Sequence, residues 1–117
     1  MELLKAAETL AALGHESRLA IFRMLVETGP EGAVVGTIAD QVAMAPATLS
    51  FHLAHLTRVG LISSQRESRF IRYSANYATM DALIAFLTSN CWQGQACLPK
   101  TSASQAVTNG RVRKSLS

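Results

Sequence analysis

The sequence predicts a mainly α-helical domain with a β-hairpin wing, which is the winged helix-turn-helix fold with about five helices. In residues 46–59, Leu49, Leu53 and Leu56 recur at helical spacing and define one apolar stripe of a helix. Directly after it, residues 61–65 and 70–74 are plausible strands joined by a polar tip. A helix followed at once by a hairpin is the order of elements in a winged helix.

The other expected helices follow from apolar periodicity over residues 3–13, 17–28, 35–42 and 77–88. Gly14 ends the first of them, and Gly29, Pro30 and Gly32 form a loop after the second. Pro46 suits the first turn of the helix over residues 46–59, because an amide there has no intrahelical partner. The last helix is apolar enough to pair with another helix.

The length of 117 residues and a hydrophobic content of 49% allow one small domain with a core. We expect it to cover residues 1–98, with residues 99–117 as a flexible basic tail rich in small polar side chains. No apolar run reaches the length of about 18 residues that a membrane span needs, and the N-terminal segment does not resemble a signal peptide. The expected location is therefore the cytoplasm, where the two cysteines would be reduced thiols.

The net charge of +3 is unevenly distributed along the chain. Residues 1–45 carry three basic and six acidic side chains, whereas residues 46–73 carry four arginines and one glutamate. The basic charge is thus concentrated on the expected helix and hairpin. Double-stranded DNA, with its phosphates, is the partner that such a distribution favours.

Several polar side chains are expected to point away from the leucine stripe. On the helix these are Thr48, Ser50, His52, His55 and Arg58, and the hairpin adds three candidate DNA-binding side chains, Arg66, Arg69 and Arg72. A helix with such an outward face can read DNA. A pair of histidines on a helix and a basic hairpin are also common as plain solvated surface, so this pattern alone leaves both interpretations open.

The segments LGHESRLAIFRML, SFHLAHLTRVGLI and RESRFIRYS resemble the arsenic-repressor (ArsR) family of metal-sensing transcription factors. The resemblance extends over about residues 3–90 and implies a homodimer formed by the first and last helices. It also implies that Thr48, Ser50 and His52 face the major groove of operator DNA, with the three arginines serving the wing. No cofactor is implied for DNA binding itself.

The family's familiar arsenic site places cysteines on the helix before the turn, but residues 35–42 contain none. Its zinc pattern on the last helix is matched here only by Asp81. The remaining candidates are Cys91 and Cys97, which resemble the C-terminal cysteines of a subgroup that binds trivalent arsenic or antimony. That subgroup often has a further cysteine where this chain has Trp92.

Two thiolates match an arsenical whose third bond is already to carbon, such as methylarsenite, whereas arsenite or antimonite would need another third ligand. The sequence therefore predicts a repressor that releases DNA when a small arsenical binds Cys91 and Cys97. One alternative is a redox sensor that forms a Cys91 to Cys97 disulfide, and another is a zinc or cadmium sensor. The sequence shows no nucleophile, base and oxyanion arrangement, so an enzyme is not expected.

Overall fold

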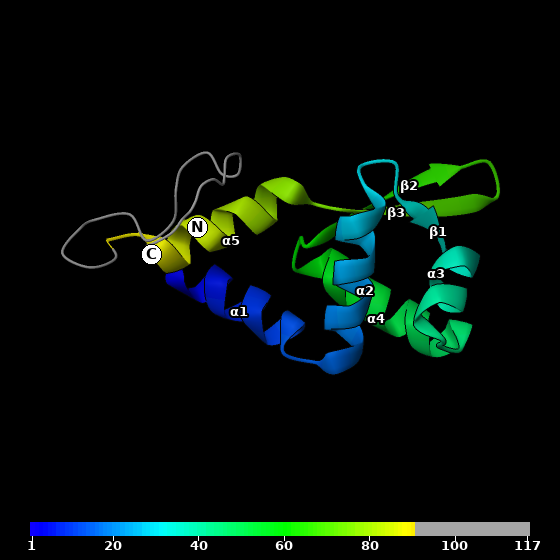
Figure 1. Cartoon of the computed structure of the whole chain (residues 1–117), viewed down its shortest axis with the longest axis horizontal. Helices are drawn as coiled ribbons and strands as arrows, with labels where there is room; N and C mark the ends of the chain where they lie inside the picture. Colours follow the sequence, from blue (N-terminus) through cyan, green and yellow to red (C-terminus); the bar gives the residue numbers. More distant parts are fainter. Residues whose placement is uncertain (91–117) are drawn as a thin grey trace, which may run out of the picture. The chain divides into compact units, whose positions relative to one another are not determined.

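The computed structural model describes residues 1–90 and has the predicted winged helix-turn-helix fold (Figure 1). Its elements are α1 (Leu3–Leu13), α2 (Glu16–Thr28), β1 (Ala33–Val34), α3 (Val35–Val42), α4 (Pro46–Arg58), β2 (Ile62–Glu67), β3 (Phe70–Ala75) and α5 (Tyr77–Thr88). The five predicted helices and the hairpin wing are confirmed. No helix in this described part of the chain is long and apolar enough to span a membrane.

The core lies where α2, α3 and α4 pack against one another and against the sheet (Figure 1). The largest fully buried apolar side chains are Ile21, Leu25, Ile38, Leu49, Leu53, Leu56, Leu61 and Ile62. The members in α2 and in α4 recur at helical spacing, so each of these two helices buries one face. The leucine stripe that predicted α4 is therefore part of the core.

Two polar contacts fix the junction between α1 and α2. The Nδ1 atom of His15 accepts a hydrogen bond from the backbone N–H of Ser17 at 3.1 Å and caps the start of α2. The Nε–H of Arg18 donates to the carbonyl of Ala12 at 2.7 Å, near the end of α1. Because a charged donor strengthens such a bond, Arg18 ties the second helix to the first.

The sheet has three antiparallel strands in the order β1-β3-β2, and β1 was not predicted. This strand has only two residues, Ala33 and Val34, which pair with Tyr73 and Arg72. Two residues are too few to show the alternation that identifies a strand in a sequence. The hairpin strands β2 and β3 are also slightly longer than expected, and their two-residue turn places Ser68 at a φ of 58°.

Residues Met1–Leu83 form one compact unit, and the described part of a second unit is the stretch 84–90 that includes the end of α5. Within the first unit, the start of α5 is anchored to the core. The hydroxyl of Tyr77 donates to the carbonyl of Val26 at 2.9 Å, and Met80 packs against the core cluster. The last helix thus begins at a fixed point, directly after the wing.

Candidate nucleic-acid interface

Helix α4 is held by its apolar stripe and by the tight turn that precedes it. Ala43 adopts the left-handed conformation, with a φ of 53°, and this reverses the chain between α3 and α4. Pro46 lies in the first turn of α4, as predicted. Since Leu49, Leu53 and Leu56 are fully buried, the opposite face of α4 is left to solvent.

The exposed face of α4 carries three of the five polar side chains predicted for it. Thr48, Ser50 and Arg58 are exposed, and His55 is half-buried. Their contact with DNA stays a prediction. Phe51 also lies on this face, with 69% of its surface exposed, although an apolar side chain in a helix is expected to lie in the core.

The expectation that His52 faces outward is wrong. Only 7% of its surface is exposed, and its ring lies 4.9 Å from that of His15, centroid to centroid. Its position explains this burial, because it comes three residues after Leu49 and four before Leu56 and so falls on the apolar stripe. Its side chain is therefore unavailable to a base edge.

The surroundings of His52 and His55 lower the pKa of both side chains. Burial, and then the charges of His15 and Arg18, lower the pKa of His52 below 6.5. Burial also lowers the pKa of His55, together with Arg18 and Arg58 and the two other histidines. The Nδ1 atom of His52 is buried without a hydrogen-bond partner, so a proton added there would place an unpaired charge in the core.

The stability of the fold is therefore expected to fall as the pH is lowered below about 6.5. In that range the unfolded chain takes up a proton on His52 and on His55, while the folded chain resists it at both. The slope is at most about 1.4 kcal/mol per pH unit for each such proton. The variant His52→Leu should have a smaller slope and an unchanged affinity for DNA, measured by urea unfolding between pH 7.5 and 5.5 and by DNA titration.

The control variant His15→Asn keeps an acceptor for the N–H of Ser17 and should largely keep the slope, because burial is the main cause of the lowered pKa of His52. A slope that is the same in His52→Leu as in the wild type would contradict the role of His52. A large loss of DNA affinity in a folded His52→Leu variant would indicate that His52 contacts DNA after all.

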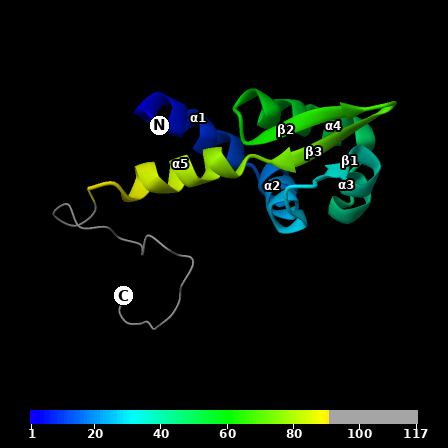
Figure 2. The same ribbon diagram turned by 90° about the horizontal axis from the view of Figure 1, so that it is seen from above.

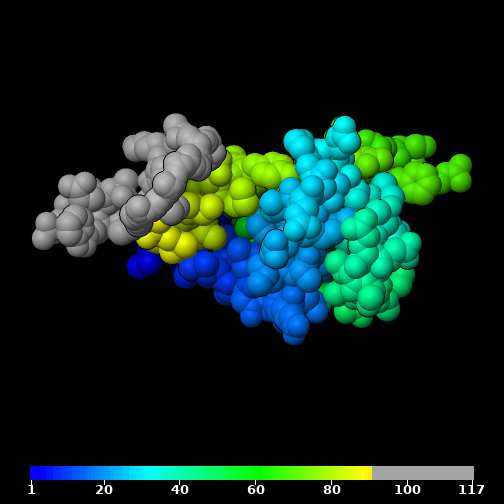
Figure 3. Space-filling view, viewed as in Figure 1, coloured from blue at the N-terminus to red at the C-terminus, as the bar shows by residue number. Residues whose placement is uncertain are grey.

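The wing presents arginines of two kinds. Arg66 and Arg69 are exposed at the hairpin tip, which projects beyond α3 and α4 (Figures 2 and 3). Arg72 is partly buried: its Nε–H donates to Oε1 of Glu67 at 3.1 Å, and its Nη1 atom lies 3.4 Å from the carbonyl oxygen of Gly32. Arg66 and Arg69 are therefore better placed than Arg72 to meet a phosphate.

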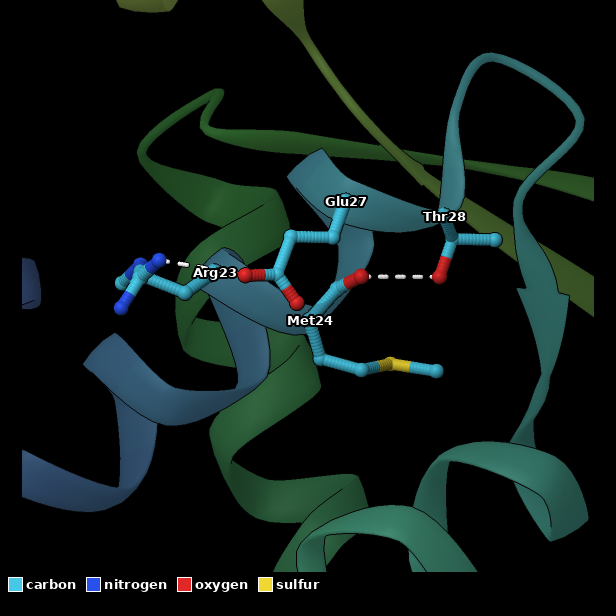
Figure 4. A network of polar contacts seen from close by, with 4 residues as sticks. All are labelled: Arg23, Met24, Glu27 and Thr28. Carbon is cyan, nitrogen blue, oxygen red and sulfur yellow. Dashed lines mark hydrogen bonds and ion pairs between the residues drawn. The ribbon is translucent and has the colours of Figure 1, made fainter.

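One exposed arginine of α2 is paired with an acidic side chain. On α2, Nη2 of Arg23 lies 3.1 Å from Oε2 of Glu27, and the hydroxyl of Thr28 donates to the carbonyl of Met24 at 2.8 Å (Figure 4). An exposed pair of this kind contributes little to stability, yet it neutralises the arginine. Among the described residues, Arg58 of α4 and Arg66 and Arg69 of the wing are exposed and have no ion pair of this kind.

The predicted thiol site lies outside the described residues, since it consists of Cys91 and Cys97. Within residues 1–90, no three His, Asp or Glu side chains are grouped so that they could hold a metal ion. The described part of the chain therefore contains the candidate DNA surface, on α4 and the wing.

Residues 13–65, which include the whole of α2, α3 and α4, match a family model described as a helix-turn-helix domain. The HTH-type transcriptional regulator YgaV of Escherichia coli is 36% identical over 83 residues, which are 71% of this chain and 82% of YgaV. Both matches include the helices that build the surface described above.

Two solved structures extend the comparison. An ArsR-like transcriptional regulator from Rhodococcus sp. RHA1 has a TM-score of 0.64 and 27% identity, and the match covers 72% of this chain and 76% of that one. The homodimeric winged helix-turn-helix DNA-binding domain of Mb0332 from Mycobacterium bovis has a TM-score of 0.60 and 24% identity, covering 71% and 75% of the two chains. At 24% identity the second comparison shows a shared fold.

Proposed function

Because the chain belongs to the ArsR-type family of helix-turn-helix transcriptional regulators, we propose that it represses transcription in the cytoplasm until a trivalent arsenical binds Cys91 and Cys97. Its relatives are transcriptional regulators and not enzymes. The observation that carries the proposal is the exposed face of α4, with Thr48 and Ser50, next to the unneutralised arginines of the wing. This surface suits the major groove and the flanking phosphates of an operator.

We propose that the repressor is a homodimer formed through α1 and α5. In α1, Leu3 and Leu4 are 73% and 67% exposed, and in α5 Leu87 is 56% exposed. Apolar side chains at such exposures on a helix favour pairing with a second copy. Two copies related by a twofold axis would present two α4 helices to half-sites about 34 Å apart.

A signal that moves α1 has a direct route to α4. The ammonium group of Lys5 donates to the carbonyl of Val59 at 2.6 Å, so α1 holds the residue that ends α4. The arsenical must bind one conformation of the dimer more tightly than the other to release DNA. In this proposal, ligand binding beyond α5 shifts the dimer interface, and the two α4 helices lose their spacing.

The ligand class follows from the number of thiols. Two thiolates complete the coordination of methylarsenite, while arsenite or antimonite would need a hydroxide, a cellular thiol or a cysteine of the partner chain as a third ligand. We therefore favour an organoarsenical. The rival is a redox-sensing repressor, in which oxidation joins Cys91 to Cys97 and releases DNA without any arsenical.

Titration of an operator duplex with the protein tests the proposal. Methylarsenite should weaken binding of the wild type at least about tenfold, which corresponds to a coupling free energy within the usual range. The variants Cys91→Ser and Cys97→Ser should bind the duplex as the wild type does and lose the response. The measurement is fluorescence anisotropy with and without methylarsenite, arsenite, antimonite, cadmium or peroxide.

The panel separates the candidates. Release by peroxide alone would favour the redox sensor, and release by cadmium alone would favour a metal sensor. Unchanged affinity with every reagent would end the induction model while leaving DNA binding in place. Loss of DNA binding in both cysteine variants would instead indicate a structural role for the thiols.

A further inference from the structure

Phe51 is the largest apolar side chain that α4 exposes. Its surface is 69% exposed, although it lies in the middle of a helix whose opposite face is fully buried. The only ring near it in the described part of the chain is that of His52, at a centroid distance of 5.7 Å and in edge-on geometry. Burial of this exposed aromatic surface against a binding partner would contribute favourably to the free energy of binding.

The surroundings of Phe51 indicate the chemistry of that partner. Ala47, four residues before Phe51, and Ala54, three residues after it, share its side of the helix, and both are exposed. Ser50, which directly precedes Phe51, is also exposed. The small neighbours leave the phenyl ring protruding from the surface. No acidic residue occurs in α4, and Arg58 lies at its end on the exposed side.

A protruding apolar ring on a helix without acidic residues and beside a basic wing fits DNA better than an apolar protein surface. The major groove offers few apolar groups, and the C5 methyl group of thymine is the one that distinguishes thymine from the other bases. Ser50, next to Phe51, can form a hydrogen bond to a base edge or a phosphate. The helix thus combines one apolar and one polar contact.

We propose that Phe51 is a specificity-determining residue that contacts a thymine C5 methyl group in each half-site of the operator. This inference rests on the proposed DNA-binding function and adds the base that is read. It predicts that the protein distinguishes thymine from uracil, which has the same Watson–Crick pairing and lacks only the methyl group.

The test begins with selection of a binding duplex from a random DNA library by the full-length wild-type protein. Each thymine of that duplex is then replaced by deoxyuridine, one position at a time. At one thymine in each half-site the replacement should weaken wild-type binding about fourfold, the value expected for one buried methyl group. The variant Phe51→Ala should lose affinity for the thymine duplex by a similar factor or more, and should bind the thymine and uracil duplexes equally.

The variant Phe70→Ala is the matched control, because Phe70 is also an exposed phenylalanine, at 58%, but lies on the wing. It should keep the discrimination between thymine and uracil. Phe51→Ala should retain the thermal unfolding midpoint of the wild type, since the side chain removed is largely in solvent.

Two results would overturn the inference and are distinguishable from failure of the proposed function. If the wild type tolerates uracil at every position, or if Phe51→Ala still prefers thymine, Phe51 does not read the methyl group although the protein binds DNA. If no duplex is enriched by the wild type at low salt, the DNA-binding proposal fails and this inference fails with it.

Discussion

Replacing Gly32 with alanine is expected to lower the free energy of unfolding by about 3 kcal/mol or more. Gly32 precedes β1 and has a φ of 72°, a conformation that side chains with a Cβ atom rarely adopt. A Cβ atom there would lie 2.1 Å from the carbonyl oxygen and 2.9 Å from the carbonyl carbon of Tyr73. Because both atoms belong to the backbone of β3, relief of the clash requires β1 and β3 to separate.

Gly36→Ala is the matched control, since a Cβ atom at Gly36 would have no neighbour within 4 Å and Gly36 lies in α3. That variant should be as stable as the wild type or up to about 1 kcal/mol more stable, because alanine favours the helix. Urea unfolding followed by circular dichroism measures both variants. Equal midpoints for Gly32→Ala and the wild type would show that the sheet tolerates the extra atom.

The order of the elements could be predicted because each large element repeats a local pattern. The leucines of α4 recur at helical spacing, and the hairpin follows them without a long loop. The short strand β1 could not be predicted, since its two residues form a strand only by pairing with Tyr73 and Arg72, about forty positions later. Gly32 shows the same limitation: its sequence position indicates a loop, and only the approach of β3 shows why glycine is needed there.

Side chains on α4 were predicted less well, because polarity was taken as a guide to exposure. His52 is polar and buried, while Phe51 is apolar and exposed. The spacing of the leucines already contained the correction for His52, which lies on their stripe. For Phe51, exposure of an aromatic residue contradicts the usual rule of burial, and such exceptions are expected at functional surfaces.

The distribution of charge along the sequence indicates that residues 46–73 are basic but cannot distinguish their arginines from one another. All four arginines of residues 46–73 count equally in a sequence. In the structure Arg72 is paired with Glu67, whereas Arg66 and Arg69 are exposed at the wing tip. The pairing depends on the hairpin register, in which Glu67 lies opposite Phe70 and Gln65 opposite Arg72.

Replacing Arg66 and Arg69 together with alanine is expected to weaken operator binding about a hundredfold at 0.1 M salt, with little change in stability. In a dimer this substitution removes four cations from the DNA surface. If each neutralises one phosphate, the plot of log affinity against log salt concentration should become less steep by about 3 to 4. Fluorescence anisotropy at several salt concentrations measures both quantities.

The variant Arg23→Ala provides the control for a change of net charge alone, because Arg23 is exposed but paired with Glu27 on α2. It should leave the salt dependence unchanged. Arg72→Ala should change the slope by less than half as much as the double variant, since the guanidinium of Arg72 is already paired with Glu67. A double variant with the wild-type slope would mean that the wing tip does not touch the phosphates, and recognition would then depend on α4 alone.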